Sequence, residues 1–181
     1  MIDAEGYRLN VGIMVTNARR ELLMGKRVRR NAWQFPQGGI DPGERPEDAL
    51  WRELFEELGY EPAQMELIGA TRGWLHYRLP QRFLRRGTPQ CIGQKQKWFL
   101  LRLRDEGARP RFDRGPRPEF DAYRWVEVER APCDVVAFKR SVYLAALREF
   151  APLLGTRLDR PLPGALHRPI HRRLAGAEDF S

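Results

Sequence analysis

Three glutamates, Glu53, Glu56 and Glu57, lie within five residues of one another in the most acidic part of the chain. Residues three and four apart share one face of a helix, so the three carboxylates are expected to project together. Two carboxylates about 6 Å apart repel by roughly 3 kcal/mol at an effective dielectric of about 20, and only Arg52 is at hand to relieve them. A divalent cation such as Mg²⁺, which takes carboxylate oxygens as ligands, turns this repulsion into attraction. The alternative is a solvated acidic face with an Arg52–Glu56 ion pair.

The segment that carries these glutamates has the features of a helix with defined ends. Pro46 suits the first turn, and the acidic residues that follow it complement the positive end of the helix dipole. Gly59 fits a left-handed C-terminal cap. The sequence therefore predicts a helix from Pro46 to Leu58. Its apolar residues are expected on the side opposite the glutamates, where they can pack on a sheet: Ala49, Leu50, Leu54 and Leu58.

Strand-like runs occupy much of the remaining sequence. A strand over Tyr7–Asn17 and its hairpin partner over Glu21–Val28 precede a short extended segment, Trp33–Pro36, and a glycine-rich loop, Gln37–Gly43. Further strands are expected within Met65–Leu79, Lys95–Arg104 and Tyr123–Val128, and a mostly helical segment over Val135–Leu154. Short strands with two helices predict an α/β fold, in which a mixed sheet is sandwiched between helices.

The length and composition indicate one folded domain. The chain has 181 residues, of which 42% are hydrophobic and 31% charged, and these proportions exclude wholesale disorder. We expect the domain to cover residues 1–154 and residues 155–181 to form a mobile basic tail. Apolar runs are too short to span a membrane, the N-terminus does not resemble a signal peptide, and two cysteines make no disulfide framework. A cytoplasmic protein that does not bind a membrane is therefore expected.

Charge is unevenly spread along the sequence. The net charge is +8, yet residues 38–66 are strongly acidic and lie between basic segments. This arrangement suits a polyanion that basic residues hold while its reacting end meets a carboxylate-bound cation. Most of the basic residues are arginines, and arginine enrichment can also follow from genome composition. Charge alone therefore leaves polyanion binding open.

Residues 38–59 follow a fixed spacing: Gly38, five residues, Glu44, seven residues, then Arg52-Glu53-Leu54-Phe55-Glu56-Glu57-Leu58-Gly59. This segment is similar to the Nudix box and matches every fixed position, with Tyr60 following in place of the usual aliphatic residue. The resemblance implies a single-domain Nudix-type α/β/α sandwich and a hydrolase of nucleoside diphosphates linked to another group. It implies that Mg²⁺ or Mn²⁺ is bound by Glu53, Glu56 and Glu57, and that four box residues are structural: Gly38, Glu44, Arg52 and Gly59.

Segments outside the box resemble one branch of that family, the bacterial RNA pyrophosphohydrolases. They are Gly6–Gly12, Trp33–Gly39, Ile92–Phe99, Pro118–Asp121 and Phe138–Arg140, and the similarity spans about residues 1–150. That branch converts the 5′-triphosphate end of RNA to a 5′-monophosphate, which exposes the transcript to decay. The resemblance thus implies single-stranded 5′-triphosphorylated RNA, and not DNA, as the partner. The related diadenosine polyphosphate hydrolases share the box and are the alternative. A non-catalytic RNA- or nucleotide-binding module is a third reading, but such modules lose a box glutamate.

The resemblance also assigns roles to individual residues. Glu119 matches a fourth acidic metal ligand, which makes the expected catalytic set Glu53, Glu56, Glu57 and Glu119. Glu56 and Glu119 are the candidates for the general base, with Glu56 preferred. Phe138 offers an aromatic face for an unpaired base, although it is equally a candidate core residue of the last helix. Substrate contacts are expected from Arg8, Arg27, Tyr77, Gln94, Lys95, Phe138 and Lys139. The sequence identifies no protein partner.

Overall fold

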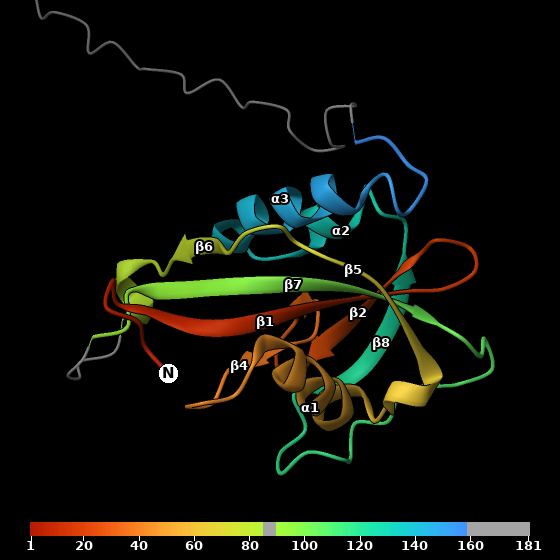
Figure 1. Ribbon diagram of the computed structural model, residues 1–181, viewed down its shortest axis with the longest axis horizontal. Helices are drawn as coiled ribbons and strands as arrows, with labels where there is room; N and C mark the ends of the chain where they lie inside the picture. The colour runs from red at the N-terminus through yellow and green to blue at the C-terminus, as the bar shows by residue number, and fades with distance from the viewer. Residues whose placement is uncertain (85–89, 159–181) are drawn as a thin grey trace, which may run out of the picture.

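The computed structural model describes residues 1–84 and 90–158. These residues form an eight-stranded sheet with helices on both faces. In Figure 1, the helices α2 (Ala131–Asp134) and α3 (Arg140–Phe150) cover one face of the sheet, and α1 (Pro46–Leu58) covers the other. The expected sandwich of a mixed sheet between helices is confirmed. Most of the predicted tail, residues 159–181, lies outside the described residues.

The sheet is built around two long parallel strands. The strands β1 (Tyr7–Thr16) and β7 (Gly93–Leu103) pair along their whole shared length, from Tyr7 opposite Gly93 to Thr16 opposite Arg102. All other named strands pair antiparallel. They are β2 (Leu22–Arg27), β3 (Trp33–Gln34), β4 (Gln37–Gly39), β5 (Met65–Ala70), β6 (Leu75–Arg78) and β8 (Phe120–Val126). The main path through the sheet runs β3-β2-β1-β7-β5.

Both central strands change partner along their length. The end of β1 pairs with β2, whereas its beginning pairs with β4, with Asn10 opposite Gly39. In the same way β7 begins beside β6 and ends beside β5. The beginnings of β1 and β7 are therefore bordered by β4 and β6, and the cavity described below opens at this end of the sheet. The strand β4 was predicted as part of a loop, because two glycines give no side-chain alternation from which a strand can be read.

The helix α1 has the predicted bounds, and Gly59 caps it with a left-handed φ of +67° and a hydrogen bond from its N–H to the Phe55 carbonyl. One prediction about this helix was wrong. Glu53 and Glu57 do not lie opposite the apolar residues but are buried beside them. On a helix the row that contains Ala49, Glu53 and Glu57 borders the Leu50–Leu54–Leu58 row, so a face broad enough to pack on the sheet includes both rows.

The long C-terminal helix begins at Arg140, later than the predicted Val135, and a short helix precedes it. The helix α2 ends at Asp134, Val135 is extended, and a 3₁₀ turn, η3 (Ala137–Lys139), precedes α3. Proline in the first turn of α2 starts that short helix, and the extended Val135 ends it. Four residues of this interruption line the cavity described below, namely Val135, Val136, Phe138 and Lys139. Two other 3₁₀ turns are η1 (Pro62–Gln64) and η2 (Gln81–Phe83).

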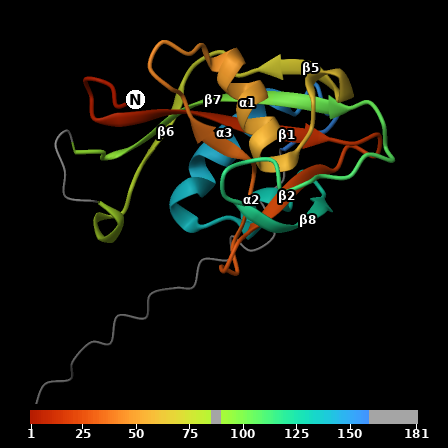
Figure 2. The same cartoon turned by 90° about the horizontal axis from the view of Figure 1, so that it is seen from below.

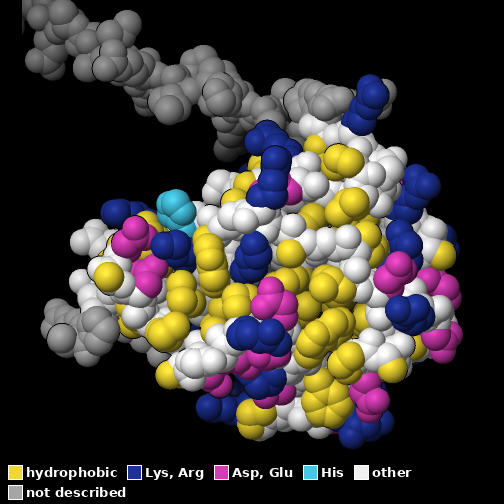
Figure 3. All heavy atoms as spheres, in the orientation of Figure 1, with side chains coloured by type: hydrophobic (Ala, Val, Ile, Leu, Met, Phe, Trp, Pro, Cys, Tyr) yellow, Lys and Arg dark blue, Asp and Glu magenta, His cyan; other side chains and the backbone are white. Residues whose placement is uncertain are grey.

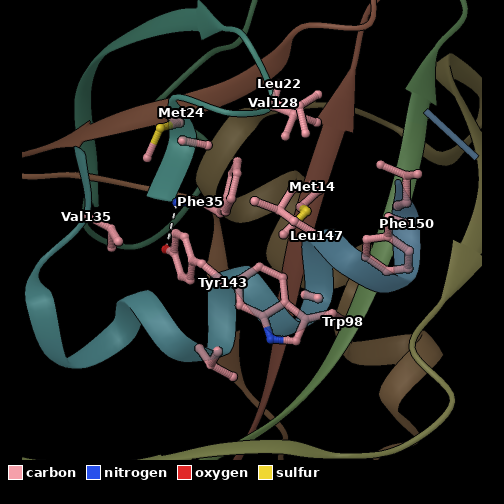
Figure 4. Packing of buried hydrophobic residues seen from close by; sticks show 14 of the residues in the cluster. Met14, Leu22, Met24, Phe35, Trp98, Val128, Val135, Tyr143, Leu147 and Phe150 are labelled. Carbon is pink, nitrogen blue, oxygen red and sulfur yellow. Dashed lines mark hydrogen bonds between the residues drawn. The ribbon is translucent and has the colours of Figure 1, made fainter. Parts of the chain in front are cut away.

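Two hydrophobic clusters, one on each face, hold these layers together. Beneath α3, the Trp98 and Tyr143 rings meet edge to face, Phe35 stacks on Tyr143, and the Phe35 N–H donates to the Tyr143 hydroxyl at 3.0 Å (Figure 4). On the opposite face, which is nearer the viewer in Figure 2, α1 packs its leucines on β1 and β7. Within the described residues, no helix is long and apolar enough to cross a membrane.

Candidate active site

A cavity of about 550 Å³ opens where β4, β6, η3 and the glutamates of α1 meet. It gathers residues that are far apart in the sequence and that the sequence analysis had singled out. Those that line it are Arg8, Arg27, Gly38, Glu53, Glu57, Tyr77, Gln94, Glu119, Phe138 and Lys139. Glu56 and Lys95 are not among the residues that line it.

Arg52 ties the loop before α1 to the helix itself. Its guanidinium donates at 2.8 Å to each carboxylate oxygen of Glu44, at 2.7 Å to the Gly39 carbonyl and at 2.7 Å to Glu53 Oε1. These hydrogen bonds lower the pKa of Glu44 and hold it ionised. Glu44 also accepts a hydrogen bond from the Asp41 backbone N–H at 2.9 Å. The pair therefore fixes the position of the loop relative to α1.

Glu53 and Glu57 carry negative charge into a poorly solvated place. Burial raises the pKa of Glu57 well above its usual range, and the nearby charges of Glu53 and Glu119 raise it further. Burial also raises the pKa of Glu53, despite its bond from Arg52. Glu57 Oε2 accepts one hydrogen bond from the Gln37 backbone N–H at 3.0 Å. Burial therefore makes both carboxylates costly to ionise in the absence of further positive charge.

The other two predicted metal ligands are held by arginines. Glu119 Oε1 lies 2.8 Å from Arg27 Nη2 in the cavity wall, and Glu56 Oε2 lies 3.7 Å from Arg52 Nη1. Among the residues that the structure describes, no three His, Cys, Asp or Glu side chains come close enough together to hold a metal ion. The chemistry of the donors nevertheless fits a hard divalent cation, because buried carboxylates with raised pKa values are stabilised by added positive charge.

A network of amides and cations forms the wall facing the glutamates. The Lys139 ammonium donates to Gln34 Oε1 at 3.2 Å and to Gln37 Oε1 at 3.0 Å. Gln37 Nε2 and the Tyr77 hydroxyl both donate to Gln94 Oε1, at 3.3 and 2.7 Å. Burial, together with the charge of Arg27, lowers the pKa of Lys139 to about 8. The sequence analysis did not assign a role to Gln34 and Gln37, although both lie in the Trp33–Gly39 segment that resembles the family.

Aromatic rings form the rim of the cavity. The Phe138 ring lies 5.7 Å from Tyr77 and 5.6 Å from Phe83, centroid to centroid, and it packs against the core cluster while it lines the cavity. Phe138 is thus partly a core residue, and its role as a stacking face for a base stays a prediction. Phe83, exposed beside it, was not predicted, because nothing in the basic segment around it marks it as part of a site.

Lys95 lies apart from this cavity. Its ammonium contacts Glu5 at 2.9 Å and Asp3 at 3.3 Å, and these bonds raise its pKa. Asp3 also accepts the Tyr7 backbone N–H at 2.9 Å. In this structure the lysine fastens the N-terminal segment to β7. On the face seen in Figure 3, acidic and basic side chains are likewise interleaved over α1.

The sequence matches the family model of the NUDIX domain over residues 6–150. The chain belongs to the Nudix hydrolase family. An RNA pyrophosphohydrolase of Pseudomonas putida is 56% identical over 158 residues, which cover 87% of this chain and 99% of the relative. One from a Marinomonas species is 56% identical over 161 residues, covering 88% and 100%.

Solved structures agree on the Nudix fold. The E. coli dihydroneopterin triphosphate pyrophosphohydrolase superposes with a TM-score of 0.65 at 21% identity, covering 80% of this chain and 96% of that one. A C. elegans Ap4A hydrolase gives 0.61 at 21% identity, covering 82% and 98%. The glutamates, the arginine brace and the cavity described above are therefore carried by a Nudix scaffold.

Proposed function

We propose that this protein is an RNA 5′-pyrophosphohydrolase that converts 5′-triphosphate RNA ends to 5′-monophosphates in the cytoplasm and so promotes mRNA decay. The name of relatives that are 56% identical over nearly their whole length supports this proposal. The structural observation that carries it is one cavity that combines buried carboxylates, a cationic amide wall and an aromatic rim. Carboxylates suit a metal-bound phosphate chain, the wall suits its oxygens, and the rim suits an unpaired base.

The proposed roles follow from this arrangement. Arg8 and Arg27 offer planar guanidinium groups for phosphate oxygens, and Lys139 adds a point charge. Phe138 presents a face on which a base of single-stranded RNA stacks. Mg²⁺ or Mn²⁺ would be held by Glu53, Glu56, Glu57 and Glu119, and when bound it supplies charge neutralisation and a water of lowered pKa.

Glu56 and Glu119 are the candidates to accept the proton of the attacking water. Glu119 lines the cavity, with Arg27 bonded to one of its oxygens. Glu56 lies one helical turn from Arg52 and outside the cavity lining. Comparing the pH–rate profiles of Glu56→Gln and Glu119→Gln separates them, because loss of the base removes the acidic limb of the profile.

Incubation with 5′-triphosphorylated RNA and Mg²⁺ tests the function. We expect release of labelled γ-phosphate and a product with a 5′-monophosphate. Glu53→Gln should abolish release, whereas Glu47→Gln, at an exposed position of the same helix, should not. Diadenosine tetraphosphate is offered in competition. Far more efficient hydrolysis of the dinucleotide would favour the alternative activity, and binding of the RNA without any release by the wild-type protein would favour a non-catalytic binding module.

A further inference from the structure

Two buried amides lie beneath the cavity, and no role has yet been assigned to them. Asn10 on β1 and Gln96 on β7 are directly opposite each other in the parallel pair. Asn10 is 2% exposed and lines the cavity, whereas Gln96 is 0% exposed and lies behind it. Two residues further along each strand, Gly12 lies against the Trp98 indole, and the apolar core begins. The pair thus marks the boundary between cavity and core.

The hydrogen bond between these amides has a direction. Gln96 Nε2 donates to Asn10 Oδ1 at 2.7 Å. A side-chain amide has one oxygen that accepts and one nitrogen that donates. The Asn10 oxygen is therefore turned toward Gln96, with one of its two lone pairs used there, and the Nδ2 donor is the group that Asn10 directs toward the cavity. Within residues 1–84 and 90–158, no hydrogen bond from Asn10 Nδ2 is formed.

Stability does not explain this pair. Gln96 Oε1 is fully enclosed and has no hydrogen-bond partner among the described residues. A buried polar atom without a partner is destabilising, and apolar side chains of similar shape would avoid the loss. The pair leaves Gln96 Oε1 without a partner and turns Asn10 Nδ2 toward the cavity. A ligand that accepts a hydrogen bond from Asn10 Nδ2 explains this arrangement.

The neighbouring amide shows the same polarity. Gln94 Oε1 already accepts from Tyr77 and Gln37, so Gln94 has only its nitrogen to offer. Gln94 lies opposite Arg8 in the same strand pair, two residues before Gln96. Arg8, Asn10 and Gln94, which all line the cavity, therefore present mainly donors, and the second lone pair of Asn10 Oδ1 is the one acceptor left among these three side chains. A surface of donors matches the non-bridging oxygens of a phosphate chain.

We infer that Asn10 is a further substrate-binding residue, whose Nδ2 donates to a non-bridging oxygen of the substrate's phosphate chain, and that Gln96 is a positioning residue that fixes the direction of the Asn10 amide. This inference rests on the proposed function for the identity of the substrate. The binding of a bare phosphate chain, however, can be measured without it.

Asn10→Asp tests the donor. The aspartate keeps an oxygen for Gln96 Nε2 but replaces the cavity-facing donor with a second acceptor. Calorimetry with inorganic tripolyphosphate at pH 8 should show at least tenfold weaker binding, and KM for triphosphorylated RNA should rise more than kcat falls. Thr71→Val is the matched control. Thr71 is a buried polar residue of the same fold that lies outside the cavity lining, so its loss should lower Tm and leave tripolyphosphate affinity unchanged.

Gln96→Glu tests the positioning role. A carboxylate behind Asn10 accepts from Nδ2, which turns the Asn10 oxygen toward the cavity. Tripolyphosphate affinity should then fall although Asn10 itself is unchanged, and Gln96→Met should cause a smaller loss. If Asn10→Asp and Gln96→Glu lower Tm but leave affinity and KM unchanged, the pair is structural only and the inference is overturned.

Amide NMR gives a readout on the wild-type protein itself. The side-chain NH₂ signals of Asn10, assigned by their loss in Asn10→Asp, should shift when tripolyphosphate is added to the wild-type protein. Unmoved signals at saturating tripolyphosphate would contradict the inference. A wild-type protein that binds tripolyphosphate through Asn10 but does not process triphosphorylated RNA would instead overturn the proposed function alone.

Discussion

The carboxylate of Glu53 lies directly over Gly38. A β-carbon added to Gly38 would stand 1.7 Å from the Glu53 Cδ, a separation that no pair of non-bonded atoms can adopt. The glycine that opens the Nudix box is therefore needed for space, because the glutamate passes through the volume that any side chain would fill. Gly39 has the same relation to Arg8, whose Nη2 lies 2.4 Å from the corresponding β-carbon position.

Gly38→Ala should therefore reduce activity far more than stability. The group that must move is the end of a flexible side chain, so Glu53 can rotate away without disturbing the backbone. We expect kcat/KM to fall by about 100-fold, since one misplaced catalytic group can cost that much, while Tm changes by only a few degrees. Gly73→Ala is the control, because a β-carbon there meets nothing within 4 Å. A Gly38→Ala enzyme with wild-type kcat/KM would contradict this reading.

Glu57→Gln should stabilise the metal-free protein at pH 8. The folded-state pKa of Glu57 is raised, so this carboxylate is more costly to ionise in the folded protein. Its contribution to folding stability therefore falls as the pH rises from about 4.5, the pKa of the unfolded state, toward the higher pKa of the folded state. The amide keeps an acceptor for the Gln37 N–H without the charge. We expect a gain of about 1 kcal/mol or more, which is a rise in Tm of about 2–4 °C, that shrinks at pH 5.

Added Mg²⁺ should have the opposite pH dependence in the wild-type protein. Ion binding to the folded state raises Tm by mass action, and it competes with protons for the same carboxylates. The rise in wild-type Tm should therefore be larger at pH 8 than at pH 5 and be strongly reduced in Glu57→Gln. Thermal melts with and without a chelator measure it, and Glu47→Gln serves as the control. Equal shifts in Glu57→Gln and wild type would exclude Glu57 from the ion site.

Substrate affinity should weaken as the pH rises through about 8, the pKa of Lys139. The buried ammonium loses its proton there and no longer attracts phosphate. KM for triphosphorylated RNA should rise about tenfold between pH 7 and 9.5, since a hydrogen bond from a charged donor contributes about 1.5–3 kcal/mol. The contribution of Lys139 to folding stability should increase between pH 8 and pH 10.5, because in this range only the unfolded state keeps the proton on the lysine.

Lys139→Met removes the titrating group, so it should show a high KM that no longer changes over this range. Lys26→Met is the control, since Lys26 is more exposed, lies 3.9 Å from Asp121 and does not line the cavity. If the KM of Lys139→Met still rose above pH 8, another group would be responsible for the dependence.

The local parts of this site could be predicted from the sequence because their signals are local. The helix from Pro46 to Leu58, its cap at Gly59 and the spacing of its glutamates all lie within one continuous segment. The burial of Glu53 and Glu57 could not be predicted, because it depends on how broad a face the sheet covers. The strand formed by Gln37–Gly39 was missed for the same reason: its evidence is the backbone of β1 and not its own side chains.

The amide wall shows a second limit of sequence reasoning. Gln34, Gln37 and Lys139 form one hydrogen-bonded group, although the lysine is about a hundred residues away from the glutamines in the sequence. The resemblance to the family implied Arg8, Arg27, Gln94 and Lys139 as substrate contacts, but it was not used to assign Gln34 and Gln37. Neutral amides carry no charge that marks them, and the direction in which each one donates is decided by its neighbours in the fold.

For Lys95, the family resemblance and the structure predict different roles. The resemblance to RNA pyrophosphohydrolases implies a substrate contact, whereas the structure pairs its ammonium with Asp3 and Glu5. If the structural pairing governs its role, Lys95→Met should lower Tm by a small amount and leave KM within about twofold of wild type, because partly exposed ion pairs contribute little. Asp3→Asn should produce the same small loss of Tm, and the double variant should lose less than the sum of the two. Arg8→Met is the positive control for a rise in KM. A tenfold rise in the KM of Lys95→Met would show that the lysine leaves Asp3 and Glu5 to bind substrate.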